Sequence, residues 1–489
     1  MSAFSSPVSV LTAPPASTAG RTFPFPTSQQ PNGALCIAFA FPEFNPLTSF
    51  LLADIENAYL TAPRPDSPSG EPTYVRPPPD HPEYRTHLWL LLKAVYGLKD
   101  SGFIFDRHRD RALLEVGWVK SGVPGLWWKW SSQPGAESLR LLGLCATFVD
   151  DLAMIGIGAS PSDLVDEIAF KGPFTITKVK ADTNGCARWA GVDIELRQDE
   201  IRLSQAEYVQ SLLQTVPPGP IPNTPLPPDS RDRPDDSPAL PASQAHSFRS
   251  LLGGLAWVAR DTRLDLAEAC NELSRSVACP TERSLSYLHG AVRYAAATKH
   301  RTLCIRRDDI PKRSEPLDVT GWGDAALGTV GCAHPHTRWL IAIRNSLIHW
   351  RSFRQPRVAR SSARAELYAS HDLVDFMEFV LPCLRVVWGE GVSGTVHTDA
   401  QDVLHLVAAD HPHPRERSVT KVVESLQEKL LERSLSSLVT QSLALRDALD
   451  ACRIRLYHIS TDLNRADPLT KSMAPTLLLT FFSQHIPDE

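Results

Sequence analysis

The residues in this sequence best suited to do chemistry are two adjacent acids, Asp150 and Asp151, which lie between two short apolar runs. Carboxylates side by side repel each other, and they stay ionised at neutral pH only when a cation lies close to both. Acidic sites rich in oxygen ligands select hard divalent cations such as Mg²⁺. A third acid, Asp54, would complete a site of three carboxylates. A surface Asp-Asp turn is the alternative interpretation of the pair.

Two buried strands must position the acid pair. The runs Leu141 to Val149 and Leu152 to Ile157 are too short to span a membrane, and their Leu, Ile and Val residues predict two strands of one hairpin. The acids would then lie at its tip. A further strand over Leu51 to Ile55 carries Asp54 near its end. The pattern therefore predicts a metal site where three buried strands end.

The last third of the chain carries a second series of acids, each beside a predicted strand end or helix start. In order, the elements are a strand from Leu317 to Trp322 ending near Asp324, a hairpin from Arg338 to Trp350, a helix capped by Ser361 or Ser362 that carries Glu366, a strand from Thr395 to Thr398 ending at Asp399, and a strand from Ile454 to Ile459 followed by Asp467. Four acids can hold two Mg²⁺ ions, one to activate water and one to stabilise the leaving oxygen.

Composition limits the remaining possibilities. With 489 residues, 43% of them hydrophobic, the chain is long enough for about three packed domains. The net charge of -5 excludes a protein held to nucleic acid by bulk positive charge. Nine scattered cysteines without a C-x-x-C pair fit a reduced intracellular protein, and no membrane span or secretory signal is expected. An intracellular location is therefore expected. The N-terminus weakly resembles a transit peptide.

Ordered sequence blocks point to a family. DIENAYL, YVRPPP, LLKAVYGLKDSG and FVDD are followed by WAGVDIE, IRLSQAEYVQSLL, NTPLPP and FRSLLGGLAWVARDTRLDLAEACNELSR. In this order and approximate spacing they resemble the reverse transcriptase of Ty1/copia-type LTR retrotransposon Pol polyproteins. GWGDAALG, SSARAELYAS, HTDAQ and NRADPLTK resemble the ribonuclease H of the same elements.

The resemblance implies a role for each acid. Asp54, Asp150 and Asp151 match the metal ligands of the polymerase, which hold two Mg²⁺ ions about 4 Å apart. Asp324, Glu366, Asp399 and Asp467 match the ligands of the ribonuclease H, which also holds two. Mn²⁺ is an alternative to Mg²⁺ at both sites.

The resemblance also implies four substrate-binding residues. Tyr59 would lie under the sugar of the incoming nucleotide, although a core tyrosine is the alternative. Gly97 would allow close backbone approach to the nucleotide and template. Lys99 would meet a phosphate or be solvated. Phe148 stands where the family usually has Tyr, and Asp100 adds negative charge near the site of an anionic substrate.

We therefore expect an α+β fold, with a reverse-transcriptase palm and thumb and truncated fingers, followed by a mixed α/β ribonuclease H-like domain. The fingers are expected to be truncated because the region upstream of DIENAYL is of low complexity. The expected boundaries are 1–33 for a disordered Ser/Pro-rich N-terminus, 34–215 for the palm and thumb, 216–243 for a Pro-rich linker, 244–312 for a helical connection, 313–475 for the ribonuclease H-like domain and 476–489 for a C-terminal tail.

The function expected from the resemblance is that of a retrotransposon-derived Pol fragment, an RNA-directed DNA polymerase with ribonuclease H activity on RNA–DNA hybrids. Its expected partners are an RNA template, an RNA–DNA hybrid, a primer, deoxynucleoside triphosphates and other Pol-derived chains. The resemblance also implies a cytoplasmic location, as in a virus-like particle, or a nuclear one. With its fingers missing, the polymerase half is expected to be the weaker one. The alternative is a catalytically inactive relic of a retroelement, or a recruited protein that binds nucleic acid.

Overall fold

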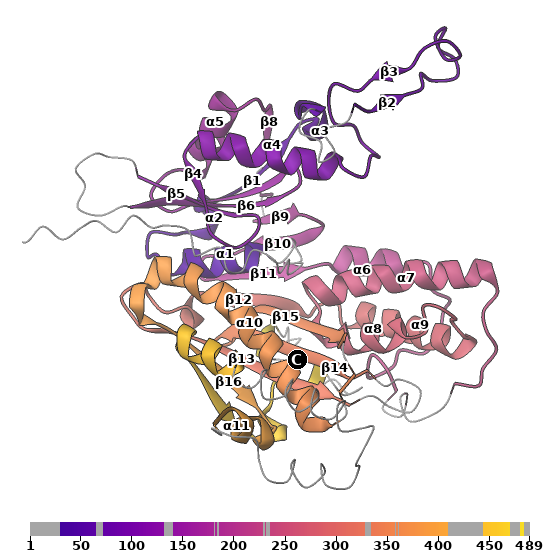
Figure 1. Cartoon of the computed structure of the whole chain (residues 1–489), viewed down its shortest axis with the longest axis vertical. Helices are drawn as coiled ribbons and strands as arrows, with labels where there is room; N and C mark the ends of the chain where they lie inside the picture. Colours follow the sequence, from indigo (N-terminus) through magenta and orange to yellow (C-terminus); the bar gives the residue numbers. More distant parts are fainter. Residues whose placement is uncertain are drawn as a thin grey trace, which may run out of the picture.

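The computed structural model describes residues 30–64, 72–131, 140–179, 181–182, 185–227, 230, 235–327, 334–356, 358–359, 361–408, 444–469 and 480–483. Within these ranges the chain forms a mixed α/β structure with three main sheets, which Figure 1 shows stacked along the long axis of the molecule. A helical group lies beside the second and third sheets (Figure 1). The small β2–β3 hairpin projects away from the first sheet (Figure 1).

The first sheet presents the acids expected at the polymerase site. Its strands, in the order β4-β5-β6-β7-β1-β8, are β4 (Trp118–Lys120), β5 (Leu126–Trp130), β6 (Leu141–Phe148), β7 (Asp151–Gly156), β1 (Phe50–Ile55) and β8 (Ile176–Val179). Successive side chains of β7 face opposite sides, so Leu152 and Met154 pack in one core cluster while Ala153 and Ile155 pack in another. The predicted hairpin and the third strand are confirmed.

Helices and short elements complete this part of the chain. The core cluster that contains Leu152 and Met154 includes residues of α4 and α5. The cluster that contains Ala153 and Ile155 includes residues of α1. The elements are α1 (Gln30–Phe39), α2 (Pro46–Ser49), α3 (Ala58–Thr61), β2 (Tyr74–Val75), β3 (Trp89–Leu90), α4 (Ser101–Glu115) and α5 (Pro161–Lys171).

The second sheet takes strands from two of the later expected segments. Its order is β18-β12-β11-β10-β9, with β9 (Cys186–Trp189), β10 (Val192–Leu196), β11 (Glu200–Ser204), β12 (Thr302–Arg306) and β18 (Phe482–Ser483). β12 lies near the end of the stretch 244–312, which was expected to form a helical connection. β18 comes from the expected tail 476–489, and the preceding Phe481 is fully buried. Apolar residues from the far end of the chain are thus part of the core of this sheet.

The helical group fills most of the helical connection expected over 244–312. It consists of α6 (Ala206–Leu213), α7 (Ala242–Asp261), the 3-10 helix η4 (Leu264–Leu266), α8 (Ala267–Ser274) and α9 (Glu282–Ala297). α7 begins inside the expected linker 216–243. That segment is also packed, because Leu226 is buried and Arg293 donates hydrogen bonds to the carbonyls of Pro217 and Pro220 at 3.1 and 2.9 Å.

The third sheet carries the second series of acids. Its order is β15-β14-β13-β16-β17, with β13 (Leu317–Ala326), β14 (His336–Ile343), β15 (Ser346–Arg354), β16 (Val392–Thr398) and β17 (Ile454–His458). β13 is antiparallel to β14 and parallel to β16, and β16 is parallel to β17. The helices are α10 (Ser362–Trp388) and α11 (Gln401–Ala408), with the 3-10 helices η5 (Arg307–Asp309), η6 (Gly389–Gly391), η8 (Thr461–Leu463) and η9 (Asp467–Leu469). The predicted strands, hairpin and capped helix are confirmed here.

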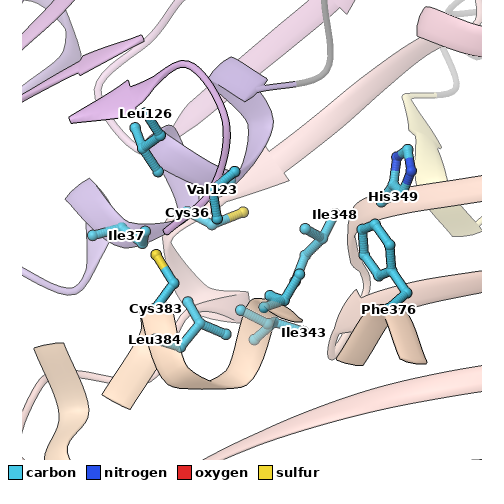
Figure 2. A pocket seen from close by; sticks show the side chains of 12 residues that line it. Cys36, Ile37, Val123, Leu126, Ile343, Ile348, His349, Phe376, Cys383 and Leu384 are labelled. Carbon is cyan, nitrogen blue, oxygen red and sulfur yellow. The ribbon is translucent and has the colours of Figure 1, made fainter. Parts of the chain in front are cut away.

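Helix α1 joins the first and third sheets. The disorder expected for 1–33 lies largely outside the described residues, but the helix already begins at Gln30. Its residues from Ala34 to Phe39 are buried in a core cluster shared with α10 and β15. Figure 2 shows Cys36 of α1 and Cys383 of α10 beside a small apolar cavity of about 50 Å³. The two sheets therefore share one hydrophobic core.

Among the described residues, no helix is long and apolar enough to cross a membrane.

Candidate functional site

Three carboxylates of the third sheet converge on one point. Asp324 comes from the end of β13, Glu366 from the first turns of α10 and Asp399 directly after β16. The ligand oxygens of these acids all lie within 4.8 Å of one another, and we call them the acidic trio. The parallel pairing of β13 with β16 brings two of them to the same sheet edge, and the Ser361 cap, which accepts a hydrogen bond from the Arg364 N–H at 3.3 Å, starts α10 beside them.

Burial makes the trio electrostatically costly without a cation. Burial, followed by the charges of Asp324 and Asp399, raises the pKa of Glu366 to about 9. Oε1 of Glu366 accepts a hydrogen bond from the Ala325 N–H at 3.1 Å, while buried Oε2 has no hydrogen-bond partner in the described part of the chain. Three clustered oxygen donors with an unsatisfied buried oxygen fit a hard divalent cation such as Mg²⁺ or Mn²⁺.

The fourth predicted acid, Asp467, lies close to the trio without joining it at ligand spacing. It begins η9, and its charge acts on Arg338, as do those of Asp324 and Glu366. Asn464 holds this turn against β13, because its Nδ2 donates to the Gly323 carbonyl at 3.1 Å and its Oδ1 accepts from the Ala466 N–H at 3.1 Å. Asn464 was not predicted as a site residue, although NRADPLTK contains it.

The three acids of the first sheet meet at the tip of the β6–β7 hairpin. Asp54 in β1 lies directly opposite Asp151 in β7, and the Ile55 N–H donates to the Asp150 carbonyl at 3.0 Å. Opposed residues of an antiparallel pair project from the same face, with Cβ atoms about 4.5–5.5 Å apart. In the described part of the chain these three acids do not reach the mutual 4.8 Å spacing of the trio.

Electrostatic repulsion is nevertheless present at this tip. Burial, then the charges of Asp150 and Asp54, raises the pKa of Asp151 to about 6. Burial and the charges of Asp150 and Glu56 also raise the pKa of Asp54. Such shifts favour a bound cation, which would relieve the repulsion.

Two further residues, which the sequence analysis missed, hold the tip in place. Buried Arg109 of α4 donates to the Val149 carbonyl at 2.8 Å, where the backbone adopts a positive φ of 52°. On the other side, a backbone hydrogen bond from Ala190 stabilises the charged form of Asp151. Ala190 and Gly191 form the β9–β10 turn, with φ values of 48° and 77°. The signal that could have identified this turn is the two-residue loop between alternating strands.

The predicted substrate-binding residues lie around the same tip. Tyr59 of α3 packs against Tyr96 and Phe105, with ring centroids 4.7 and 5.9 Å away, and burial and the Asp150 charge raise its pKa. Phe148 contacts Trp189 edge-on at 6.0 Å and lines a pocket of about 610 Å³ beneath the hairpin tip.

Gly97 and Lys99 lie on the exposed loop before α4. Gly97 has a φ of 91°, which favours glycine, and a Cβ there would meet no atom within 4 Å. Asp100, expected to repel an anionic substrate, forms an ion pair with Arg64 at 2.7 Å. Its charge is therefore compensated within the protein.

The arginines of the helical group have partners inside the protein. Arg263, for example, is buried against Asp265 at 2.8 Å, and Arg249 donates to the Val277 carbonyl at 2.8 Å. The remaining pairs are Arg260 with Asp261, Arg275 with Glu272, Arg283 with Asp235, and Arg293 with the Pro217 and Pro220 carbonyls. These contacts indicate a structural role for the arginines.

Sequence comparison places the chain beside retroelement polyproteins, although no family model matches it. The "Retrovirus-related Pol polyprotein from transposon RE1" of Arabidopsis thaliana is 23% identical over 88% of this chain and 27% of its own length. The "Transposon Ty1-GR2 Gag-Pol polyprotein" of Saccharomyces cerevisiae is 21% identical over 86% of this chain and 23% of its own length. The chain thus spans about a quarter of these relatives. It resembles the reverse-transcriptase and ribonuclease H region of Ty1/copia-type Pol polyproteins, as the sequence blocks predicted.

The solved structures that match this chain are less identical to it in sequence than these polyproteins. A foamy viral protease-reverse transcriptase in complex with an RNA/DNA hybrid covers 87% of this chain at 12% identity, with a TM-score of 0.45. The N-terminal RNase H domain of rv2228c from Mycobacterium tuberculosis covers 31% at 15% identity, with a TM-score of 0.21.

Proposed function

We propose that this chain is a retrotransposon-derived Pol fragment that hydrolyses the RNA strand of RNA–DNA hybrids at the acidic trio. The observation that carries the proposal is the convergence of Asp324, Glu366 and Asp399 within 4.8 Å. The similarity to Ty1/copia-type Pol polyproteins supports the choice of substrate. A hybrid differs from DNA by the 2′-hydroxyls of one strand, which a protein can recognise.

The trio would hold two divalent ions, which supply an activated water and stabilise charge on the phosphoryl group. The residues of the chain prepare this site. The Ala325 N–H fixes one oxygen of Glu366 and leaves the other directed to a ligand. Burial and the neighbouring carboxylates raise the pKa of Glu366, so a bound cation would favour its ionised form and cation binding would be accompanied by proton release. Asp467 adds negative charge beside the trio.

We assign RNA- and DNA-templated DNA synthesis to the first sheet, with Asp54, Asp150 and Asp151 as its metal ligands and Tyr59, Gly97, Lys99 and Phe148 around primer and nucleotide. The raised pKa values of Asp54 and Asp151 support a cation site. Among the described residues, these acids are more widely spaced than the acidic trio. This spacing favours a second candidate function for the first sheet, in which it is a relic that keeps the polymerase fold without the activity. Primer extension with deoxynucleoside triphosphates, compared with Asp151→Asn, distinguishes the two.

The ribonuclease H proposal is tested by cleavage of a labelled RNA–DNA hybrid with Mg²⁺ or Mn²⁺. Mutation of a residue that only orients a metal ligand typically lowers metal affinity or activity by about 10–100-fold. Asp399 is proposed as a ligand itself, so Asp399→Asn should slow cleavage by at least about 100-fold. The matched control is Asp402→Asn, an exposed acid in the first turn of α11, which should cleave at the normal rate. No cleavage by the folded parent protein with either ion would reject the activity in favour of a non-catalytic nucleic-acid-binding relic.

A further inference from the structure

A buried arginine lies beside the acidic trio. The side chain of Arg338 in β14 is 0% exposed, and its backbone pairs directly with Asp324 of β13. Opposed residues of an antiparallel pair project from the same face. Burial lowers the pKa of Arg338 to about 10, against the charges of Asp324, Glu272, Asp467 and Glu366. The guanidinium therefore remains charged at neutral pH, within electrostatic reach of the site.

The contacts of this guanidinium link the site to the helical group. Its Nη2 lies 2.5 Å from Oε2 of Glu268 in α8, a carboxylate that is itself 3% exposed. Neither Nε, Nη1 nor Nη2 makes a hydrogen bond within the described residues, so the Glu268 contact is an ion pair without aligned N–H groups. Buried donors without acceptors are costly, and surrounding negative charge must compensate that cost.

We propose that Arg338 is a built-in counter-ion of the acidic trio, which holds the carboxylates together before a divalent ion binds and weakens the binding of that ion. Glu268 moderates this effect, because it neutralises part of the arginine charge from the side of α8. Arg338 has no exposed surface and is therefore a positioning residue that does not touch the nucleic acid. The proposal rests on the proposed function only in placing divalent ions at the trio, and it does not require cleavage.

The sign of the effect on metal affinity tests this role. Mn²⁺ binding is measured by the electron paramagnetic resonance of free Mn²⁺. All variants carry Asp150→Asn and Asp151→Asn, so that Mn²⁺ binding at the hairpin tip does not contribute to the signal. Arg338→Met, which keeps an unbranched side chain without the charge, should tighten binding by about tenfold or more. Glu268→Gln, which removes the charge that opposes the arginine from the side of α8, should weaken binding by a similar factor. Arg338→Lys should remain close to the parent protein.

A purely structural role predicts a different pattern. If Arg338 only supports the fold, both Arg338→Met and Glu268→Gln should weaken binding, and the parent affinity should exceed that of either variant. That result, or unchanged affinity, would overturn the proposal, as would the absence of Mn²⁺ binding in every variant. Far-UV circular dichroism verifies folding, and the double variant Arg338→Met/Glu268→Gln avoids a lone buried charge. If the two substitutions change Mn²⁺ affinity in opposite directions but the protein does not cleave the hybrid, the counter-ion role of Arg338 stands and only the catalytic function is rejected.

Discussion

At the scale of single residues, burial determines which ionisable groups carry charge. His349 of β15 illustrates this outside the acidic trio. It stacks on Phe376 with ring centroids 4.6 Å apart, and burial, aided by the Arg351 charge, lowers its pKa to about 3. The ring is therefore neutral in the folded protein at both pH 7 and pH 5.

This histidine should make the protein sensitive to acid. Below pH 6.5 the unfolded chain binds a proton at His349 that the folded chain rejects, so stability falls as the pH falls toward 3. At pH 5 this amounts to about 2 kcal/mol. His349→Leu should therefore reduce the loss of unfolding free energy between pH 7 and pH 5, measured in urea, by about that amount. The exposed His405→Leu should leave the loss unchanged, and an identical loss in both variants would contradict this account.

At the scale of elements, the β9–β10 turn supports Asp151 from a second sheet. Gly191 has a φ of 77°, and a Cβ there would lie 2.4 Å from the Trp257 ring. Both the conformation and the contact favour glycine, because a Cβ would collide with the partly buried ring of Trp257.

Gly191→Ala should consequently lower the unfolding free energy by about 1–3 kcal/mol. It should also slow any polymerase reaction by displacing the Ala190 N–H from Asp151. The control is Gly253→Ala in α7, where a Cβ meets nothing within 4 Å and where alanine should stabilise the helix by up to about 1 kcal/mol. Thermal unfolding of both variants checks the prediction, and equal effects would contradict it.

The sequence predicted the elements that have strong local signals. Apolar runs identified β6 and β7, and the Ser361 cap identified the start of α10. β18 could not be predicted, because a two-residue strand has no periodicity and exists only through pairing with β12. Arg338 was equally hidden, since arginine is almost never fully buried without a partner, and its partner Glu268 lies 70 positions away in the sequence.

At the scale of the whole molecule, α1 makes the first and third sheets interdependent. Ile37 is 1% exposed in the core cluster that both sheets share. Truncation of a buried Ile to Ala costs about 2–5 kcal/mol, so Ile37→Ala should lower the stability of both sheets together. Calorimetry should show one unfolding transition that shifts as a whole. Leu47→Ala, at a residue 53% exposed, should have little effect, and two separate transitions would contradict a shared core.

The measurement that tests the central claim most directly is the crystallographic location of Mn²⁺ by its anomalous scattering in soaked crystals of the full chain. We expect a peak among the carboxylates of Asp324, Glu366 and Asp399, and we expect Asp399→Asn to abolish it. A well-ordered trio without a peak, at an Mn²⁺ concentration that saturates other sites in the crystal, would contradict a divalent-ion site and with it the proposed ribonuclease H activity.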